Sequence, residues 1–323
     1  MRSRLALTIV AITLLTLLAA ASRAQDAQQL VEPPAQFAEG TAPVEGGDVY
    51  YQVHGDLRSG KTPLLVLHGS FMHGEFMRPI AKPFFEDRPV ILVDQRGHGR
   101  TGDLPGPITY EILADDAAAV LDSLGIERAD VLGYSMGCNA ALFMAVRHPK
   151  RVRKLIAISG TFSKSGWYPA ILAAFDKWTP EAFAGGPLEA EYKRLSPDPG
   201  QFGTLVEELR VLDTAAADIP DQSLRAIGAR TMIIMGDADG VTLEHTINLF
   251  KLRGGGTEEI ALKGILTEPP RARLAILPAT THVGVLGEGD LIHALVTPFL
   301  DDKVKPTPPG FFAEPTQPEG SKP

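Results

Sequence analysis

The sequence predicts a doubly wound α/β domain in which a mostly parallel, twisted sheet carries helices on both faces. Short apolar runs recur along the chain with little polar alternation, as in strands that are buried on both sides. Helical patterns separate several of these runs, and 323 residues are enough for a large core. The expected strands are 64–67, 90–93, 129–132, 155–158, 231–235 and 274–277.

The expected helices alternate with these strands and cover residues 110–124, 136–147, 243–252 and 291–300. The stretch 162–226 interrupts this alternation, because it contains no strand-like run. It is rich in aromatic residues, which are Trp167, Tyr168, Phe175, Trp178, Phe183 and Tyr192. We expect a small helical insertion here, placed over the carboxyl edge of the sheet, where α/β proteins locate their sites.

Composition excludes several classes of protein. A formal net charge of −8 and a pI near 5.5 argue against nucleic-acid binding, because no basic excess is present to displace counterions. The single cysteine, Cys138, excludes an intramolecular disulfide framework and a multi-cysteine zinc site. No metal-binding H-E-x-x-H and no dinucleotide-binding glycine motif occurs, so we expect no metal and no cofactor.

The N-terminus has the pattern of an export signal. Two arginines in the first four residues precede an uncharged apolar run from Leu5 to Ala21, and small residues follow at Ser22 and Ala24. We expect residues 1–24 to be a signal peptide that is cleaved after Ala24, which predicts a periplasmic or secreted protein. The alternative is an uncleaved N-terminal membrane anchor.

Beyond the signal, we expect three segments. Residues 25–47 are polar and punctuated by proline and glycine, and they predict a flexible lead-in. Residues 48–302 hold the strand and helix pattern of the folded domain. Residues 303–323 are proline-rich with little apolar periodicity, which predicts a disordered tail.

The most specific local motif is G-Y-S-M-G at residues 133–137. It follows the expected strand 129–132 and opens the expected helix 136–147, which is the setting of the G-x-S-x-G nucleophile elbow. A serine in such a strained turn projects its hydroxyl, and the flanking glycines let chain segments pass closely. Ser135 is therefore the predicted nucleophile.

An oxyanion hole is predicted from two backbone positions. His68-Gly69-Ser70 ends the first buried strand, and a chain reversal there can offer the backbone N–H of Ser70 to a developing oxyanion. Met136, the residue after the nucleophile, would supply the second N–H. The alternative for residues 68–70 is an ordinary glycine turn at a strand end.

A serine nucleophile needs a base, and the base needs an orienting carboxylate. Among the histidines, His282 alone lies in a loop directly after a late strand, so it can reach the elbow. Two carboxylates follow the strand 231–235 and are eligible as the acid. We select Asp239, with Asp237 as the reserve acid.

The chain order Ser135, Asp239, His282 is that of α/β-hydrolases, and the sequence resembles this superfamily, specifically its AB-hydrolase-1 branch. The resemblance covers residues 48–301. It implies that the acid is the third residue after Gly236, which is Asp239. It also implies that Ser70 and Met136 form the oxyanion hole and that residues 162–226 are the family's variable cap. A long connection at 253–273 departs from the pattern and leaves the choice between the two aspartates open. The matching stretches are L-L-V-L-H-G-S, V-D-Q-R-G-H-G-R-T, V-L-G-Y-S-M-G, M-I-I-M-G-D-A-D-G and L-A-I-L-P-A-T-T-H.

A serine at the elbow favours acyl transfer, whereas haloalkane dehalogenases and epoxide hydrolases of this fold place aspartate there. The expected function is a secreted serine hydrolase that cleaves a small or medium carboxylic ester or lactone through an acyl-enzyme. Alternatives are a cofactor-free haloperoxidase or perhydrolase, a C–C bond hydrolase, and a non-catalytic scaffold. The expected partner is a small acyl substrate, with no nucleic acid and no stable membrane partner unless the signal stays uncleaved.

Overall fold

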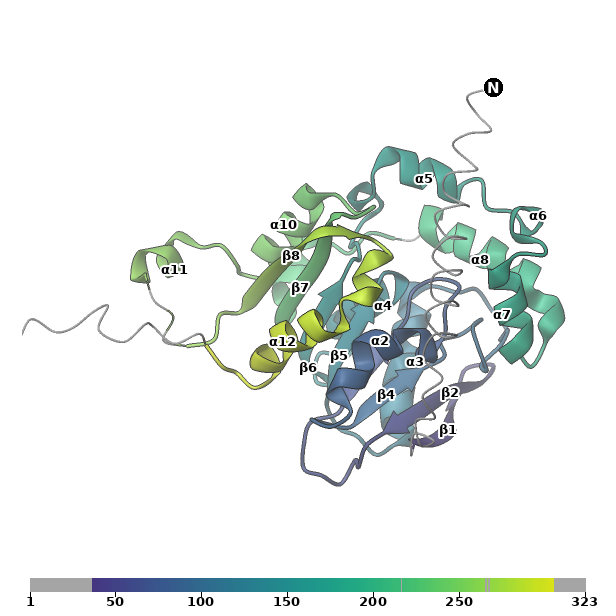
Figure 1. Cartoon of the computed structure of the whole chain (residues 1–323), viewed down its shortest axis with the longest axis horizontal. Coiled ribbons are helices and arrows are strands. Elements are labelled where there is room, and N and C mark those ends of the chain that lie inside the picture. Colours follow the sequence, from purple (N-terminus) through teal and green to yellow (C-terminus); the bar gives the residue numbers. More distant parts are fainter. Residues whose placement is uncertain (1–36, 216, 265, 267, 305–323) are drawn as a thin grey trace, which may run out of the picture.

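One eight-stranded sheet in the order β1-β2-β4-β3-β5-β6-β7-β8 runs through the molecule (Figure 1). The computed structural model describes residues 37–215, 217–264, 266 and 268–304. β2 pairs antiparallel with β1 and with β4, and every other neighbouring pair is parallel. The strands are β1 (Phe37–Val44), β2 (Gly47–His54), β3 (Leu64–Leu67), β4 (Val90–Val93), β5 (Ala129–Tyr134), β6 (Val152–Ile158), β7 (Arg230–Ala238) and β8 (Ala272–Thr281).

Two apolar layers enclose the sheet because successive strand residues point to opposite faces. In β3, Leu65 and Leu67 pack into the layer formed by α3 (Tyr110–Ser123), α4 (Met136–Arg147) and α10 (Leu243–Leu252). Leu64 and Val66 pack into the opposite layer, formed by α2 (Arg78–Ala81) and α12 (Gly289–Leu300). All four residues of β3 are fully buried, as expected for a central parallel strand.

The predicted fold class is confirmed, and each expected strand and helix is present with bounds that differ by a few residues. The expectation of a flexible lead-in over 25–47 is wrong for residues 37–47. These residues form β1 and the turn into β2, and all eight residues of β1 pair with β2. The part of the lead-in before residue 37 lies outside the described residues, as do the signal at 1–24 and all but the first two residues of the tail.

The insertion at 162–226 is helical, as expected. Three of its helices start with a proline at the first position, where the missing N–H costs no intrahelical bond. Leu205, Val206 and Leu209 of α8 anchor the insertion, because they are buried in the same layer as α3 and α4. The helices are α5 (Pro169–Phe175), α6 (Pro180–Phe183), α7 (Pro187–Leu195), α8 (Phe202–Ala215) and α9 (Asp221–Ala226).

The long connection at 253–273 begins at a buried arginine and then leaves the body of the molecule. It carries α11 (Glu258–Lys263), which projects beyond β8 on the side away from α6, α7 and α8 (Figure 1). Arg253 has no exposed surface, and its guanidinium donates to Thr231 Oγ1 at 3.1 Å and to the carbonyls of Ile227 at 2.6 Å and Ala229 at 2.9 Å. This side chain therefore holds the loop that enters β7.

Arg253→Met is expected to destabilise the protein by about 3 kcal/mol, because it removes several buried hydrogen bonds from one charged side chain, to Thr231 Oγ1 and to the carbonyls of Ile227 and Ala229. Urea unfolding followed by circular dichroism measures this loss as a lower midpoint. Lys251→Met, at an exposed position on the last turn of α10, is the control and should unfold like the wild type. Equal midpoints for the two variants would show that the carbonyls find other donors.

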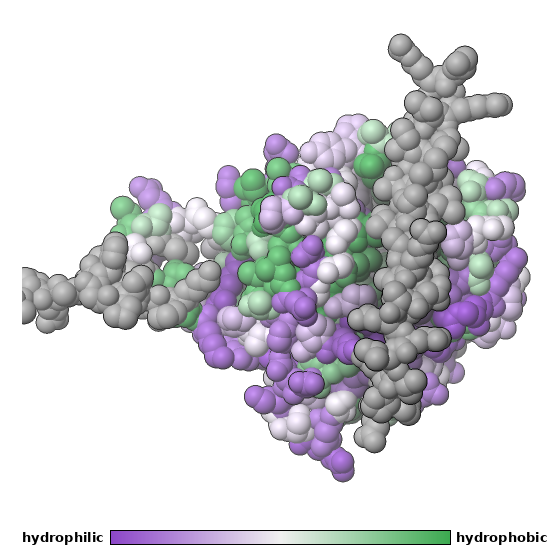
Figure 2. Space-filling view, in the orientation of Figure 1, coloured by the Kyte–Doolittle hydropathy of each residue, from purple (hydrophilic) through white to green (hydrophobic). Residues whose placement is uncertain are grey.

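Hydrophobic residues also gather on one face of the surface, over α10, β7 and β8 (Figure 2). Two large side chains of these elements are exposed, Ile247 of α10 and Ile276 of β8. β8 is the last strand of the sheet, so one of its edges has no neighbouring strand among the described residues. Within the same part of the chain, every helix is too short or too polar to cross a bilayer.

Candidate active site

Ser135 occupies the sharp turn between β5 and α4. Its backbone has φ 54° and ψ −120°, a strained conformation for a residue with a side chain. The two glycines of the motif permit this turn: a Cβ on Gly133 would lie 2.1 Å from the Gly137 carbonyl oxygen, and a Cβ on Gly137 would lie 2.3 Å from that of Leu67. Any side chain at either position would push α4 away from the ends of β3 and β5.

Gly137→Ala is expected to cost at least about 1–3 kcal/mol of stability, because the new methyl group collides with backbone atoms that cannot rotate away. Thermal unfolding measures this cost as a lower Tm. Gly228→Ala is the matched control, since a Cβ there meets nothing within 4 Å. If the two variants melt at the same temperature, the close packing of α4 on β3 does not contribute to stability.

The structure joins the three predicted residues in one chain of hydrogen bonds. His282 Nε2 lies 3.0 Å from Ser135 Oγ, and His282 Nδ1 lies 2.7 Å from Asp239 Oδ1. The residues come from three separate strand ends: Ser135 after β5, Asp239 after β7 and His282 after β8. The parallel order of these strands brings their carboxyl ends to one edge of the sheet.

The two candidate acids have different environments. The Asp239 side chain is completely buried, and its Oδ1 also accepts the backbone N–H of Val241 at 3.0 Å. Asp237 is exposed, and its Oδ1 accepts the backbone N–H of Thr280 at 3.2 Å. The carboxylate that contacts His282 is therefore Asp239. Asp237 instead holds the loop before His282 through its hydrogen bond with Thr280.

Electrostatics favour an ionised Asp239. Burial acts to raise the pKa of its carboxyl, but the charge of His282, the hydrogen bond from its ring and smaller contributions from Val241 and Ser159 together outweigh burial, so the pKa is lowered from its usual value. An ionised Asp239 accepts a hydrogen bond from Nδ1–H of His282, which keeps the ring proton on Nδ1. This leaves Nε2 with a free lone pair facing the Ser135 hydroxyl, which is the arrangement that a general base requires.

Two aromatic residues hold His282 in place. The Tyr134 hydroxyl donates to the His282 carbonyl at 2.9 Å, and the Trp167 ring meets the imidazole edge-on with centroids 5.3 Å apart. Sequence reasoning missed both contacts. Tyr134 was only a variable position of the elbow motif, and Trp167 was one of several aromatic residues in the insertion.

The predicted oxyanion donors lie beside the nucleophile. A Cβ on Gly69 would be 3.2 Å from Ser135 Cβ, so the loop that carries Ser70 touches the elbow. Phe71, which has φ 61°, donates its N–H to His98 Nε2 at 3.2 Å. The Ser70 N–H makes no hydrogen bond to another residue of the described chain, and Met136 is the first residue of α4, where the N–H has no intrahelical acceptor.

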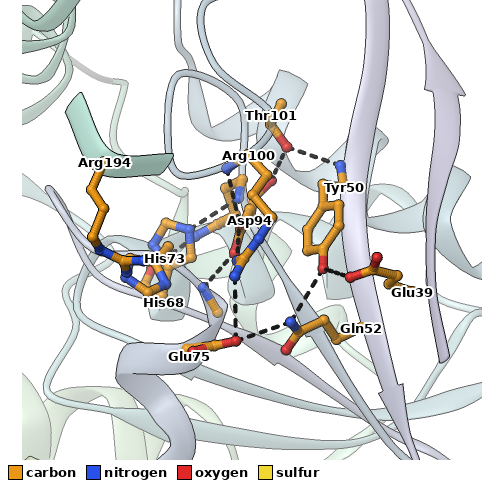
Figure 3. A network of polar contacts seen from close by, with 12 residues as sticks. Glu39, Tyr50, Gln52, His68, His73, Glu75, Asp94, Arg100, Thr101 and Arg194 are labelled. Atoms are coloured by element: carbon orange, nitrogen blue, oxygen red, sulfur yellow. Dashed lines mark hydrogen bonds and ion pairs between the residues drawn. The ribbon is translucent and has the colours of Figure 1, made fainter. Parts of the chain in front are cut away.

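A network of polar contacts holds the loop after β3, which carries Ser70, against the loop after β4 (Figure 3). His68 Nε2 accepts the Gln95 N–H at 3.0 Å, and burial lowers the pKa of His68 to about 3, so its ring is neutral and structural. Asp94 accepts the backbone N–H of Gly74 at 2.7 Å and that of Arg100 at 2.9 Å. The loops after β3 and β4 are therefore fixed to each other.

The same network reaches the insertion. His73 Nε2 lies 2.9 Å from Glu191 Oε1 on α7, and Arg194 of the same helix holds that carboxylate (Figure 3). The loop next to the nucleophile is thereby tied to the helices above it. Among the residues that the structure describes, no group of three or more His, Cys, Asp or Glu side chains is placed to hold a metal ion.

Comparisons with known proteins agree with this geometry. Residues 62–188 match the family model described as alpha/beta hydrolase fold. A protein of Caulobacter segnis named as a carbamate hydrolase, RutD, is 36% identical over 122 residues, which are 37% of this chain and 45% of that protein. The chain thus matches less than half of the length of this curated relative.

Two solved structures share the fold over most of the chain. One is described as Est816, an N-acyl homoserine lactone degrading enzyme; it has a TM-score of 0.61 and 22% identity and covers 80% of this chain and 100% of its own. The other is the enol-lactonase from Burkholderia xenovorans LB400, with a TM-score of 0.61, 20% identity and coverage of 81% and 100%. The chain has the α/β-hydrolase fold, and residues 62–188 match the model of that family, as the sequence motifs predicted.

Proposed function

We propose that this chain is a serine hydrolase that cleaves small or medium carboxylic esters or lactones. The observation that supports this best is the continuous contact from Ser135 Oγ through the His282 ring to the buried Asp239 carboxylate. A hydroxyl, an imidazole and a carboxylate in this order activate the hydroxyl as a nucleophile.

The proposed reaction has two halves. Ser135 Oγ attacks the ester carbonyl while His282 Nε2 takes its proton, and the N–H groups of Ser70 and Met136 stabilise the oxyanion of the tetrahedral intermediate. His282 then gives the proton to the leaving alcohol oxygen, and the acyl group stays on Ser135. Water attacks this acyl-enzyme with His282 as the base, which releases the acid and restores the serine.

Aromatic side chains above the proposed site favour an apolar acyl group. Trp167 packs edge-on against Phe175 and Phe175 against Trp178, with centroids 5.2 Å and 4.8 Å apart. Trp178 in turn meets Phe71 at 5.0 Å. This row of rings runs from the base, His282, to the loop of the oxyanion donor, so an apolar group bound beneath it would lie between the two.

The test uses the full-length chain with p-nitrophenyl acetate and butyrate, a lactone panel and a fluorophosphonate probe. We expect hydrolysis of at least one substrate class and covalent labelling of Ser135. Absence of both hydrolysis and labelling would contradict the proposal. The panel includes lactones because two structural neighbours are described as lactone-cleaving enzymes.

Carbamate hydrolysis is a second candidate, favoured by the match to RutD. A carbamate carbonyl can undergo the same attack, so carbamates belong in the substrate panel. A perhydrolase would instead show peroxide-dependent halogenation with negligible ester turnover. Export to the periplasm is proposed from residues 1–24 alone, and N-terminal sequencing of the mature protein tests cleavage after Ala24.

A further inference from the structure

A small cavity lies between the core and the insertion, next to the proposed catalytic residues. Its volume is about 20 Å³, room for one water molecule or a chemical group of that size. Its walls come from α3, α4, α8, the loop after β6 and the segment after α8. The residues that carry the argument below are Tyr110, Asn139, Lys164, Trp167, Asp213 and Asp218.

One wall of the cavity contains a buried carboxyl group that the proposed reaction does not use. Asp213 of α8 is 9% exposed, and its Oδ1 accepts the Tyr110 hydroxyl at 3.3 Å. Within the described part of the chain, its Oδ2 accepts no hydrogen bond. This oxygen can therefore accept a hydrogen bond from a donor that enters the cavity.

Two contacts link the cavity to the proposed catalytic residues. Asn139 stands one helical turn after Ser135 on α4, where its backbone N–H donates to the Ser135 carbonyl at 3.2 Å. Trp167 forms another part of the wall, and its ring meets His282 with centroids 5.3 Å apart. One turn of helix and one indole ring therefore separate the cavity from the nucleophile and its base.

The charge around the cavity selects the ligand. Two carboxylates, Asp213 and Asp218, face it against one ammonium group, that of Lys164. Asp218 and Lys164 are exposed, and the Lys164 backbone N–H donates to Asp218 at 3.0 Å. Acceptors thus predominate, and the buried one, Asp213, has the oxygen without a donor.

We propose that this cavity is a substrate subsite that binds a small hydrogen-bond-donating end group, an amino or hydroxyl group, with Asp213 as the acceptor. The inference rests on the proposed function and narrows its substrates to esters or lactones that carry such a group at one end. When Asp213 is ionised, it repels substrates that end in a carboxylate. The size of the cavity restricts the group to one heavy atom with its hydrogens.

The test compares p-nitrophenyl esters of linear acyl chains of increasing length, each ending in an ammonium, hydroxyl, methyl or carboxylate group. At the length that reaches the cavity, we expect kcat/KM for the ammonium or hydroxyl ester to exceed that of the methyl ester by about tenfold, the value of one hydrogen bond to a charged group. Equal values for all end groups at every length would overturn the proposal.

Two substitutions at the acceptor separate recognition from structure. Asp213→Asn keeps an acceptor oxygen, so it should retain the preference for hydroxyl and lose the preference for ammonium. Asp213→Leu should lose both preferences. Asp221→Asn, an acidic residue of α9 outside the cavity lining, is the control and should change neither preference. A preference that survives Asp213→Leu would show that another group binds the substrate.

Binding without turnover distinguishes failure of this inference from failure of the proposed function. Calorimetric titration of Ser135→Ala with the corresponding non-hydrolysable amides measures end-group preference directly. Tighter binding of amino- or hydroxyl-ended amides supports the subsite even if no ester is hydrolysed. Uniform binding contradicts the subsite even if esters are cleaved.

The ionisation of Asp213 gives a pH-dependent prediction. Burial raises the pKa of Asp213 from 3.8 to about 7, and Tyr110 and His282 act in the opposite direction. The other charged groups at the cavity are Lys164 and Asp218. A raised carboxyl pKa stabilises the folded state below about pH 4, and this contribution is lost as pH rises to about 7. Asp213→Asn cannot titrate, so its Tm should exceed that of the wild type increasingly between these pH values. A constant difference in Tm would contradict the burial of an ionisable Asp213.

Discussion

Ser135→Ala is expected to reduce kcat/KM for the best ester substrate by at least about 10⁴-fold, since loss of the nucleophile in a serine triad removes nearly all covalent catalysis. The hydroxyl makes one hydrogen bond, to His282, and alanine fills the same turn. The Tm should therefore stay close to that of the wild type, which separates lost chemistry from lost folding.

Labelling by a fluorophosphonate gives an independent readout of the same variant. The probe should modify the wild type at Ser135 and leave Ser135→Ala unmodified. The hydrolysis that remains in Ser135→Ala would come from the oxyanion donors and from substrate binding, because the substitution leaves both in place. Full activity in Ser135→Ala would assign the chemistry to another group.

Asp239→Asn is expected to lower kcat/KM by about 10³–10⁴-fold. The asparagine amide N–H₂ can face Nδ1 of His282 and turn that nitrogen into an acceptor, which places the ring proton on Nε2. The base would then point an N–H at Ser135 and could not take its proton.

Asp237→Asn is the matched control for this substitution. The two residues stand two positions apart after β7, yet only Asp239 contacts the His282 ring. The asparagine oxygen at 237 can still accept the Thr280 N–H, so activity should remain close to that of the wild type. A large loss in Asp237→Asn together with an active Asp239→Asn would reverse the assignment of the acid.

The fold was predictable because its central strands are apolar on both faces. Leu64 to Leu67 need no alternation to be recognised, since each residue is buried between two layers of helices. The β1–β2 hairpin was not predictable in the same way. β1 lies at the edge of the sheet, five of its eight residues are exposed, and it contains a glycine and a proline, which are typical of loops.

Some residues of the proposed site could likewise be predicted from the sequence, and others could not. Ser135, Asp239 and His282 each follow a recognisable strand, so their positions in the sequence already placed them at one edge of the sheet. Asp213 could have been found, because it continues the apolar stripe of Leu205 and Leu209 at a spacing of four residues. The contact of Trp167 with His282 depends on how the insertion folds back, which local sequence does not encode.

The placement of Trp167 has a consequence for protein engineering. The insertion leaves the core after β6 and returns at β7, and these strands are direct neighbours in the sheet. Within the insertion, the Ile219 N–H donates to the Phe162 carbonyl at 2.8 Å, so these two residues lie close together and the segment between them is a natural unit to transplant between relatives. Trp167 packs on His282, so a chimera whose first junction lies after Trp167 keeps this contact and should retain turnover. A chimera whose first junction lies before Trp167 replaces this support of the base together with the substrate pocket.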